Sequence, residues 1–224
     1  MRPEMEADSV GAGIARPKME EAIVGAIINR PFPKPYQEET TMIIDPIHFN
    51  LKDGRPAVLR NSAPEDAEQV LHMFRTIIGE TDFLMAYTEE KEKLTVEAEA
   101  EILNKINQSP DSLLLICEVE GVIAGDCDIR FNSRMKTGHR AGIGIGILKK
   151  YWNQGIGTAM FEAMISVAEK REGLLQLELE FIEGNARGRA LYEKMGFRIV
   201  AMKPDAVKLK DGSLRNEYTM IRKM

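Results

Sequence analysis

The spacing of apolar residues separates an irregular N-terminal stretch from a longer region with regular periods. Small and polar residues prevail in residues 1–18, whereas residues 20–29 carry an apolar stripe that predicts one short helix. Alternate prolines, Pro31, Pro33 and Pro35, favour an extended segment after it. We therefore expect residues 1–45 to form an N-terminal extension, partly helical or disordered. It is either a flexible arm or a segment that docks on the domain or on a second subunit.

Residues 46–224 show the alternating strand and helix periods of one folded domain. Apolar runs flank Asp53 and Gly54, a dipeptide typical of a β-hairpin turn. A helical period covers residues 67–78, a loop is expected over 80–93, and Thr95 is a suitable N-cap for a second helix. The remaining predicted elements are strands over 113–119, 122–131, 140–148, 174–181, 197–201, 207–209 and 217–222, and helices over 158–171 and 186–195.

One predicted strand is unusual because glycine occupies every second position. Residues 140–148 read RAGIGIGIL, so one face of this strand is nearly bare. Glycine weakens strands. Such a face therefore indicates the close approach of a ligand or of another backbone, or else a bulge or a tight helix contact.

The segment after this strand has the features of an anion-binding turn. Gly155 and Gly157 lie directly before the predicted helix. Free backbone N–H groups at a helix start, together with the helix dipole, favour a phosphate group there. However, the lysine of a Walker A loop is missing after Gly157, and Met160 stands where a dinucleotide-binding fingerprint needs glycine. The sequence therefore does not predict an ATP or dinucleotide site.

Two segments identify the kind of domain. YWNQGIGTAM (151–160) is followed by LELEFIEGNARGRALYEKMGF (177–197). Together they resemble the GNAT superfamily of acetyl-CoA-dependent N-acetyltransferases, and the resemblance extends over about residues 55–224. It implies a mixed α/β (α+β) fold, with a bent, mostly antiparallel sheet and helices on both faces. It also implies an enzyme that transfers acetyl from acetyl-CoA directly to a primary amine of a small molecule or a peptide N-terminus.

The resemblance implies roles for individual residues. The acetyl-CoA pyrophosphate would bind the turn, and the pantetheine arm would pair along the bare side of the glycine-rich strand, whose N–H groups would polarise the thioester carbonyl. Tyr192 would protonate the departing thiolate, although a core aromatic role is the alternative. The implied cofactor-binding residues are Ile145, Gly146, Ile147, Asn153, Gln154, Gly155, Ile156, Gly157, Thr158 and Asn185.

Trp152 departs from the family pattern, which often has Arg or Gln at this position. The side chain that would have helped to hold the pyrophosphate is therefore missing. Either Lys149, Lys150 or Gln154 compensates for it, or the backbone of the turn suffices.

Carboxylates in two predicted strands are candidates for a general base. Strand alternation places Glu178 and Glu180 on one face of residues 174–181. An interior strand should be apolar on both faces, so these acids indicate either a base for the acceptor amine or an incompletely covered, solvated face. Glu180 is preferred because it matches a glutamate of ribosomal-protein N-terminal acetyltransferases. Asp126 and Asp128 likewise either line the acceptor pocket or lie on a solvated face.

Composition and charge argue against several other classes of function. The net charge is −5 and no basic stripe is present, so we expect no nucleic-acid partner. No apolar run spans a bilayer and no secretory leader is visible, which predicts a cytoplasmic protein without membrane contact. Neither the two cysteines nor the three scattered histidines predict a metal site. We expect a monomer or homodimer, and a noncatalytic acyl-CoA-binding regulatory module is the alternative to an enzyme.

Overall fold

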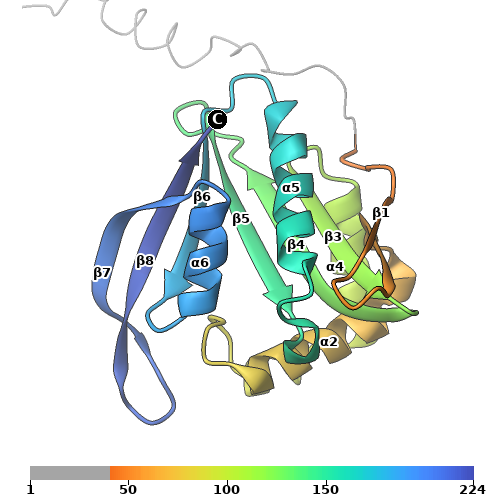
Figure 1. Ribbon diagram of the computed structural model, residues 1–224, viewed down its shortest axis with the longest axis horizontal. Coiled ribbons are helices and arrows are strands. Elements are labelled where there is room, and N and C mark those ends of the chain that lie inside the picture. Colours follow the sequence, from red (N-terminus) through yellow and green to blue (C-terminus); the bar gives the residue numbers. More distant parts are fainter. Residues whose placement is uncertain (1–40) are drawn as a thin grey trace, which may run out of the picture. The chain divides into compact units, whose positions relative to one another are not determined.

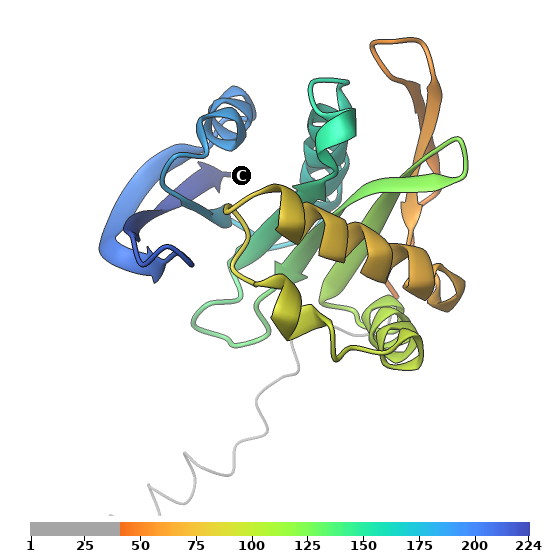
Figure 2. The same cartoon turned by 90° about the horizontal axis from the view of Figure 1, so that it is seen from below.

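The computed structural model describes residues 41–224, so nearly all of the predicted extension lies outside the described residues. The described chain forms an eight-stranded sheet in the order β1-β2-β3-β4-β5-β6-β8-β7. Neighbouring strands are antiparallel except for β5 and β6. Helices α2 and α4 cover one face, and α5 and α6 cover the other (Figures 1 and 2). The expected fold class is therefore confirmed.

The strands and helices begin and end close to the predicted positions. The strands are β1 (Ile47–Asn50), β2 (Pro56–Asn61), β3 (Ser112–Val119), β4 (Val122–Phe131), β5 (Arg140–Ile147), β6 (Gln176–Ile182), β7 (Arg198–Lys208) and β8 (Leu214–Lys223). The helices are α2 (Ala67–Glu80), α3 (Thr88–Lys91), α4 (Val96–Asn107), α5 (Ile156–Glu169) and α6 (Ala186–Lys194), with 3₁₀ turns at Pro64–Asp66 and Lys149–Tyr151.

Two details differ from the predicted elements. The segments 197–201 and 207–209 belong to one strand, β7, whose register with β8 shifts between Lys203 and Val207. This irregularity interrupts the alternation that would have revealed a continuous strand. The predicted loop after α2 also contains a single helical turn, α3.

Two helical layers hold the central strands in place. On α5, Met160, Phe161 and Met164 are completely buried against the sheet. On the opposite face, Val70 and Met73 of α2 are equally buried. Each such side chain stabilises the fold by roughly 1.5–3 kcal/mol relative to an exposed one. Strands β4 and β5 are therefore fixed from both sides.

Strands β5 and β6 are paired only at their beginnings. Their parallel register joins Arg140–Gly142 to Gln176–Glu178 and ends there. Beyond this point the two strands separate, as Figure 1 shows. Among the described residues, no strand pairs with β5 on this side from residue 143 to its end. The backbone groups along that edge are consequently available to a ligand.

Candidate active site

A cavity of about 430 Å³ lies between the separated strands. Its wall combines the edge of β5, the turn before α5, the start of α6, part of β6 and the segment after α2. Figure 2 shows that last segment, drawn in yellow, crossing beneath the gap in the sheet. Predicted residues that line the cavity are Ile145, Gly146, Ile147, Asn153, Gly155, Ile156, Gly157, Thr158, Glu180, Asn185 and Tyr192.

Hydrogen bonding to β4 determines which groups of β5 point into the gap. The Leu148 N–H donates to the Ala124 carbonyl oxygen at 2.9 Å. Because backbone groups alternate between the two edges of a strand, Gly146 also directs its N–H toward β4. Ile145 and Ile147 direct theirs toward the gap. Of the three predicted residues of β5, these two can therefore donate to a bound molecule.

The turn before α5 curls around the cavity through two residues in the left-handed region. Asn153 has a φ of 62°, and the N-cap residue Gly155 has a φ of 100°. This conformation is accessible to glycine and tolerated by asparagine. The free N–H groups of the first turn of α5 thereby begin at the cavity wall. The arrangement has the partial positive charge that an anion requires.

Gly157 allows α5 and α6 to approach each other closely. A Cβ atom at this position would lie 2.7 Å from the Leu191 Cδ2 atom. A side chain here would therefore require the Leu191 side chain to move. The close approach keeps the starts of both helices at the same end of the cavity.

Gln154 is the predicted cofactor-binding residue that does not line the cavity. Its Oε1 accepts a hydrogen bond from the Asp53 N–H at 3.3 Å, and its carbonyl oxygen accepts one from the Lys52 N–H at 3.1 Å. Gln154 thus holds the β1–β2 turn. The sequence could not show this, because the hairpin lies about a hundred residues earlier in the chain.

Trp152 occupies the position where the family often has a cation or an amide. Its Nε1 donates to the Ile147 carbonyl oxygen at 2.7 Å, so the indole fastens the turn to β5. The Arg187 guanidinium lies over its ring. Arg187 of α6 therefore supplies a positive charge at this position, and the indole ring of Trp152 stabilises it by a cation–π interaction.

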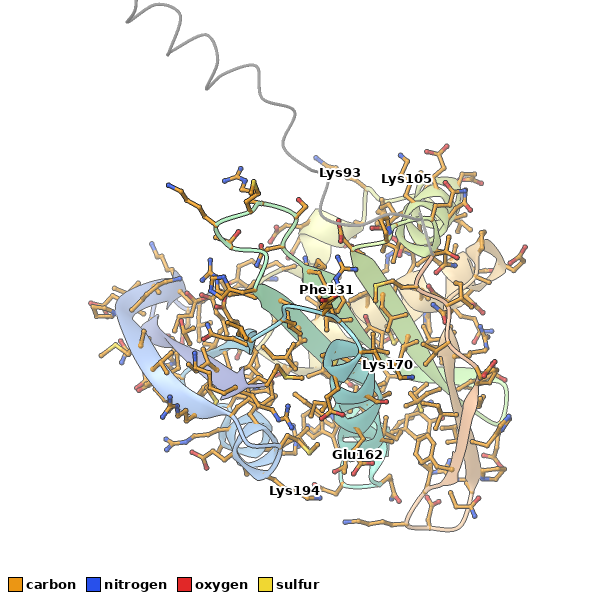
Figure 3. The ribbon with its side chains drawn as sticks, turned by 90° about the horizontal axis from the view of Figure 1, so that it is seen from above. Lys93, Lys105, Phe131, Glu162, Lys170 and Lys194 are labelled. Atoms are coloured by element: carbon orange, nitrogen blue, oxygen red, sulfur yellow. The ribbon has the colours of Figure 1, made fainter. Side chains whose placement is uncertain are left out.

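Basic side chains around the turn end of the cavity come from two distant segments, the β1–β2 turn and α6. Lys52, Arg187 and Lys194 line the cavity, whereas Lys149 and Lys150, which the sequence offered as replacements, do not. The Lys194 Nζ donates to the Thr158 hydroxyl at 3.3 Å, which links α6 to α5. Figure 3 shows Lys194 on α6, beside α5. Arg187 could have been suspected from its place in the first turn after Asn185.

Asn185 is both the N-cap of α6 and part of the cavity wall. Its Oδ1 accepts a hydrogen bond from the Gly188 N–H at 2.9 Å. This bond fixes the side chain and leaves the Nδ2 group to donate to a bound molecule.

Tyr192 lies deep in the cavity wall and is 8% exposed. Its ring packs against Phe161 and Phe181, with centroids 5.7 and 5.9 Å away. Burial raises the pKa of its hydroxyl to about 12. The hydroxyl thus keeps its proton throughout the neutral range. The same apolar surroundings also favour protonation of a thiolate placed beside it.

The two glutamates of β6 have different surroundings. Glu178 pairs with Arg140 at 3.1 Å and accepts a hydrogen bond from the Gln176 amide. Glu180 lines the cavity, and its side chain is 52% exposed while pairing with Lys203 at 3.2 Å. The geometry therefore brings Glu180, and not Glu178, to the cavity.

The bare face of β5 is occupied by carboxylates from β4. A Cβ atom on Gly144 would lie 2.5 Å from the Asp128 Oδ1, and one on Gly146 would lie 3.0 Å from the Asp126 Oδ1. The glycine pattern thus accommodates side chains of the neighbouring strand. The pairing of the pantetheine with the backbone of this strand stays a prediction, and the free edge of β5 is the surface available for it. Asp126 is only 6% exposed, so a solvated position is wrong for this residue.

Two further features were searched for in the described chain. Residues 41–224 contain no group of three or more histidine, cysteine or acidic side chains arranged to hold a metal ion. Within the same range, no helix has the length and apolar character needed to cross a membrane.

Comparison with known proteins agrees with the fold. The family model for the acetyltransferase (GNAT) family matches residues 80–197. The L-amino acid N-acetyltransferase AaaT of Escherichia coli K12 is 25% identical over 118 residues, which represent 53% of this chain and 72% of AaaT.

Solved structures extend the comparison to most of the domain. A GNAT-family acetyltransferase from Streptococcus pneumoniae is 28% identical with a TM-score of 0.70, covering 75% of this chain and 99% of its own. The yncA protein of Salmonella typhimurium, solved with acetyl-CoA, shares the fold at 15% identity and a TM-score of 0.64, covering 78% and 94%. The chain therefore belongs to the GNAT acetyltransferase family, which confirms the expected class of acetyl-CoA-dependent acyltransferase.

Proposed function

We propose that the protein transfers acetyl from acetyl-CoA directly to a primary amine of a small molecule or a peptide N-terminus. The observation that carries this proposal is that a single cavity joins a free strand edge and a helix start to Tyr192 and Glu180. These are the groups that binding a phosphorylated thioester and transferring its acyl group require. We assign this activity to a domain comprising residues 46–224.

The donor end of the cavity fits acetyl-CoA. The N–H groups at the start of α5, with Arg187 and Lys194 beside them, are suited to the pyrophosphate. Along the β5 edge, the N–H groups of Ile145 and Ile147 can pair with the pantetheine amides or polarise the thioester carbonyl. Asn185 offers its Nδ2 group between these two places.

The chemical step then follows from two side chains. Glu180 takes a proton from the acceptor ammonium, which frees the nitrogen lone pair. The nitrogen bonds to the thioester carbonyl carbon, and the carbon–sulfur bond breaks. Tyr192 donates its hydroxyl proton to the departing sulfur. Phe161 and Phe181 exclude water from the tyrosine, so that acyl transfer is favoured over hydrolysis.

The acceptor end of the cavity favours an amine that carries an apolar group. Phe83, Leu84 and Met85 follow α2 and line the main cavity opposite the turn. Leu84 and Met85 also line a second cavity of about 190 Å³, whose wall includes Val207 and Leu209 of the β7–β8 region. An apolar substituent next to the amine would fit there. The amino acid acceptors named for AaaT are consistent with this choice.

The test is a panel of amines assayed for release of the CoA thiol from acetyl-CoA. L-phenylalaninamide, L-methioninamide and an alanine tripeptide represent apolar acceptors, and spermidine is the polar comparison. We expect amine-dependent thiol release with the apolar acceptors and a mass increase corresponding to one acetyl group. Tight acetyl-CoA binding without release for any amine would instead indicate a noncatalytic acyl-CoA-binding module. Calorimetric binding of ATP in place of CoA would contradict the assignment of the turn.

A further inference from the structure

Asp126 is an acidic residue that is buried as deeply as residues of the apolar core. It is 6% exposed, and its Oδ1 has no hydrogen-bond partner within residues 41–224. Burying a polar group without a partner destabilises a fold by roughly 1–3 kcal/mol, and more for a charged group. An apolar residue at this position would be more stable. Groups retained in this way are often part of a functional site.

The position of Asp126 relates it to the cavity. It lies opposite Gly146 in the β4–β5 register, and its Oδ1 would be 3.0 Å from a Cβ atom on that glycine. Gly146 lines the cavity, as does Ile77 of α2, which lies beside the same glycine. Asp126 does not itself line the cavity, but its carboxyl group lies next to Gly146, which does. The N–H groups of β5 proposed to polarise the thioester belong to the two residues that flank Gly146.

The charges around Asp126 disfavour its ionised form. Burial raises its pKa to about 8, assisted by the neighbouring carboxylates of Asp128 on the same strand and Glu99 on α4. Its cross-strand neighbours, Ile116 on β3 and Gly146 on β5, carry no charge. Asp128 has its own cation in Arg130, which pairs with it at 2.7 Å. The carboxyl group of Asp126 therefore changes its protonation state in the range in which amines become reactive.

Acetylation of an ammonium group must dispose of two protons. The nitrogen begins with three protons and keeps one in the amide. Glu180 accounts for the proton lost before attack, and Tyr192 supplies the proton that the sulfur gains. The second proton on nitrogen must leave as the tetrahedral intermediate collapses. Either the Tyr192 phenolate left by the first step takes this proton, or a second base does.

We propose that Asp126 accepts this second proton, which crosses the bare glycine face of β5 through a water molecule in the cavity. The inference rests on the proposed acetyltransferase function and deepens it. One of the two protonated carboxyls then restores the Tyr192 hydroxyl, and the other releases its proton to solvent. One proton is thereby released per acetylation, as the overall reaction requires. Asp126 is therefore a positioning residue and not a catalytic one, because it receives the proton through a water molecule and does not touch the reacting atoms.

The experiment compares the full chain with its Asp126→Asn variant from about pH 6 to about pH 9. The acceptor is L-phenylalaninamide, or the fastest amine of the panel, at saturating acetyl-CoA. At the acidic end Asp126 is protonated in the wild type, so the two proteins should have similar kcat values. At the alkaline end only the wild type has a carboxylate, and we expect its kcat to be at least about 10-fold higher. The ratio of the two rates removes the titration of the amine itself.

The matched control is Asp128→Asn, on the same face of the same strand. Its kcat at the alkaline end should equal that of the wild type, because Asp126 keeps its carboxylate. Loss of the neighbouring charge lowers the pKa of Asp126, so the kcat of this variant should begin to rise at a lower pH. A ratio for Asp126→Asn that is constant across the range would overturn the inference while leaving the acetyltransferase function intact. A wild type that acetylates no amine at any pH would overturn both. If Asp126→Asn proves unfolded by circular dichroism, Asp126→Ser replaces it, and the same ratio decides.

Discussion

The donor and acceptor ends of the cavity are built in different ways. The donor end is built mainly from one continuous segment, residues 143–158, whose backbone N–H groups it presents, with side chains of residues 185–194 beside them. The acceptor end collects side chains from the segment after α2, from β6 and from the β7–β8 region. Substitutions leave backbone N–H groups in place, whereas they change the shape and chemistry of a wall formed by side chains. Such a division suits an enzyme family with one donor and many acceptors.

Tyr192 lies where the two ends meet, and its replacement should have the largest effect. Tyr192→Phe keeps the ring that packs on Phe161 and removes the proton donor. We expect kcat to fall about 10- to 1000-fold with acetyl-CoA affinity nearly unchanged. The measurement is turnover at saturating acetyl-CoA together with the thermal midpoint. Tyr218→Phe is the control, because Tyr218 stacks on Phe181 at 5.2 Å and should affect only stability. Normal turnover in Tyr192→Phe would remove this residue from the mechanism.

Glu180 tests whether the acceptor end acts through one carboxylate. Glu180→Gln keeps the size of the side chain and removes the base. We expect kcat/KM for the amine to fall about 10- to 100-fold. Glu178→Gln serves as the control, since Glu178 is held by Arg140 away from the cavity wall. Equal losses of kcat/KM in the two variants would show that Glu178 and Glu180 act together. That result would contradict the assignment of the base to Glu180 alone.

Arg187 tests whether the donor end depends on side chains at all. Arg187→Ala should weaken acetyl-CoA binding about 10-fold, since a charge-assisted hydrogen bond contributes about 1.5–3 kcal/mol. Calorimetry with CoA measures this loss. Arg189→Ala is the control, because Arg189 lies on the exposed side of α6 in a pair with Glu193. Unchanged affinity in Arg187→Ala would mean that the backbone of the turn holds the pyrophosphate unaided.

The last prediction concerns stability and not activity, and it links Asp126 to pH. Its pKa is about 8 in the folded chain against an ordinary value of 3.8, so the folded state holds this proton more tightly. The resulting stabilisation is complete below the ordinary pKa and is lost as the pH rises through about 8. The urea midpoint of the wild type should therefore fall relative to that of Asp126→Asn between about pH 5 and pH 8. A pH-independent difference between the two midpoints would argue against the buried titration.

The donor end could be predicted from the sequence because its groups are local. The glycine-containing turn and the helix after it are adjacent in the chain, so their backbone conformation follows from short-range rules. Within this segment, the direction of the Gly146 N–H toward β4 and that of the Gln154 side chain were not predicted. The direction of Gln154 depends on the β1–β2 hairpin, which a local pattern does not contain.

The acceptor end could not be predicted in the same way because it depends on strand register. Strand alternation places Asp126 and Asp128 on one face, but it does not show which glycines lie opposite them. The pairing of β4 with β5 supplies that information. Burial of Asp126 depends in addition on α2 and α4, which reach this face from earlier parts of the chain. The resemblance to a family supplied Tyr192 and the preference for Glu180, but it did not describe the apolar wall of the acceptor end.

The contact between the glycines of β5 and the acids of β4 also limits how the sequence can change. Gly144 leaves no room for a Cβ atom beneath Asp128, and Gly146 leaves little beneath Asp126. An alanine at either glycine thus requires the carboxylate of its partner to move or a smaller residue to replace it. In relatives we expect positions 126 and 146, and positions 128 and 144, to vary as pairs. Substitutions in this strand pair should therefore be coordinated, whereas those in the apolar wall contributed by the segment after α2 can occur one at a time.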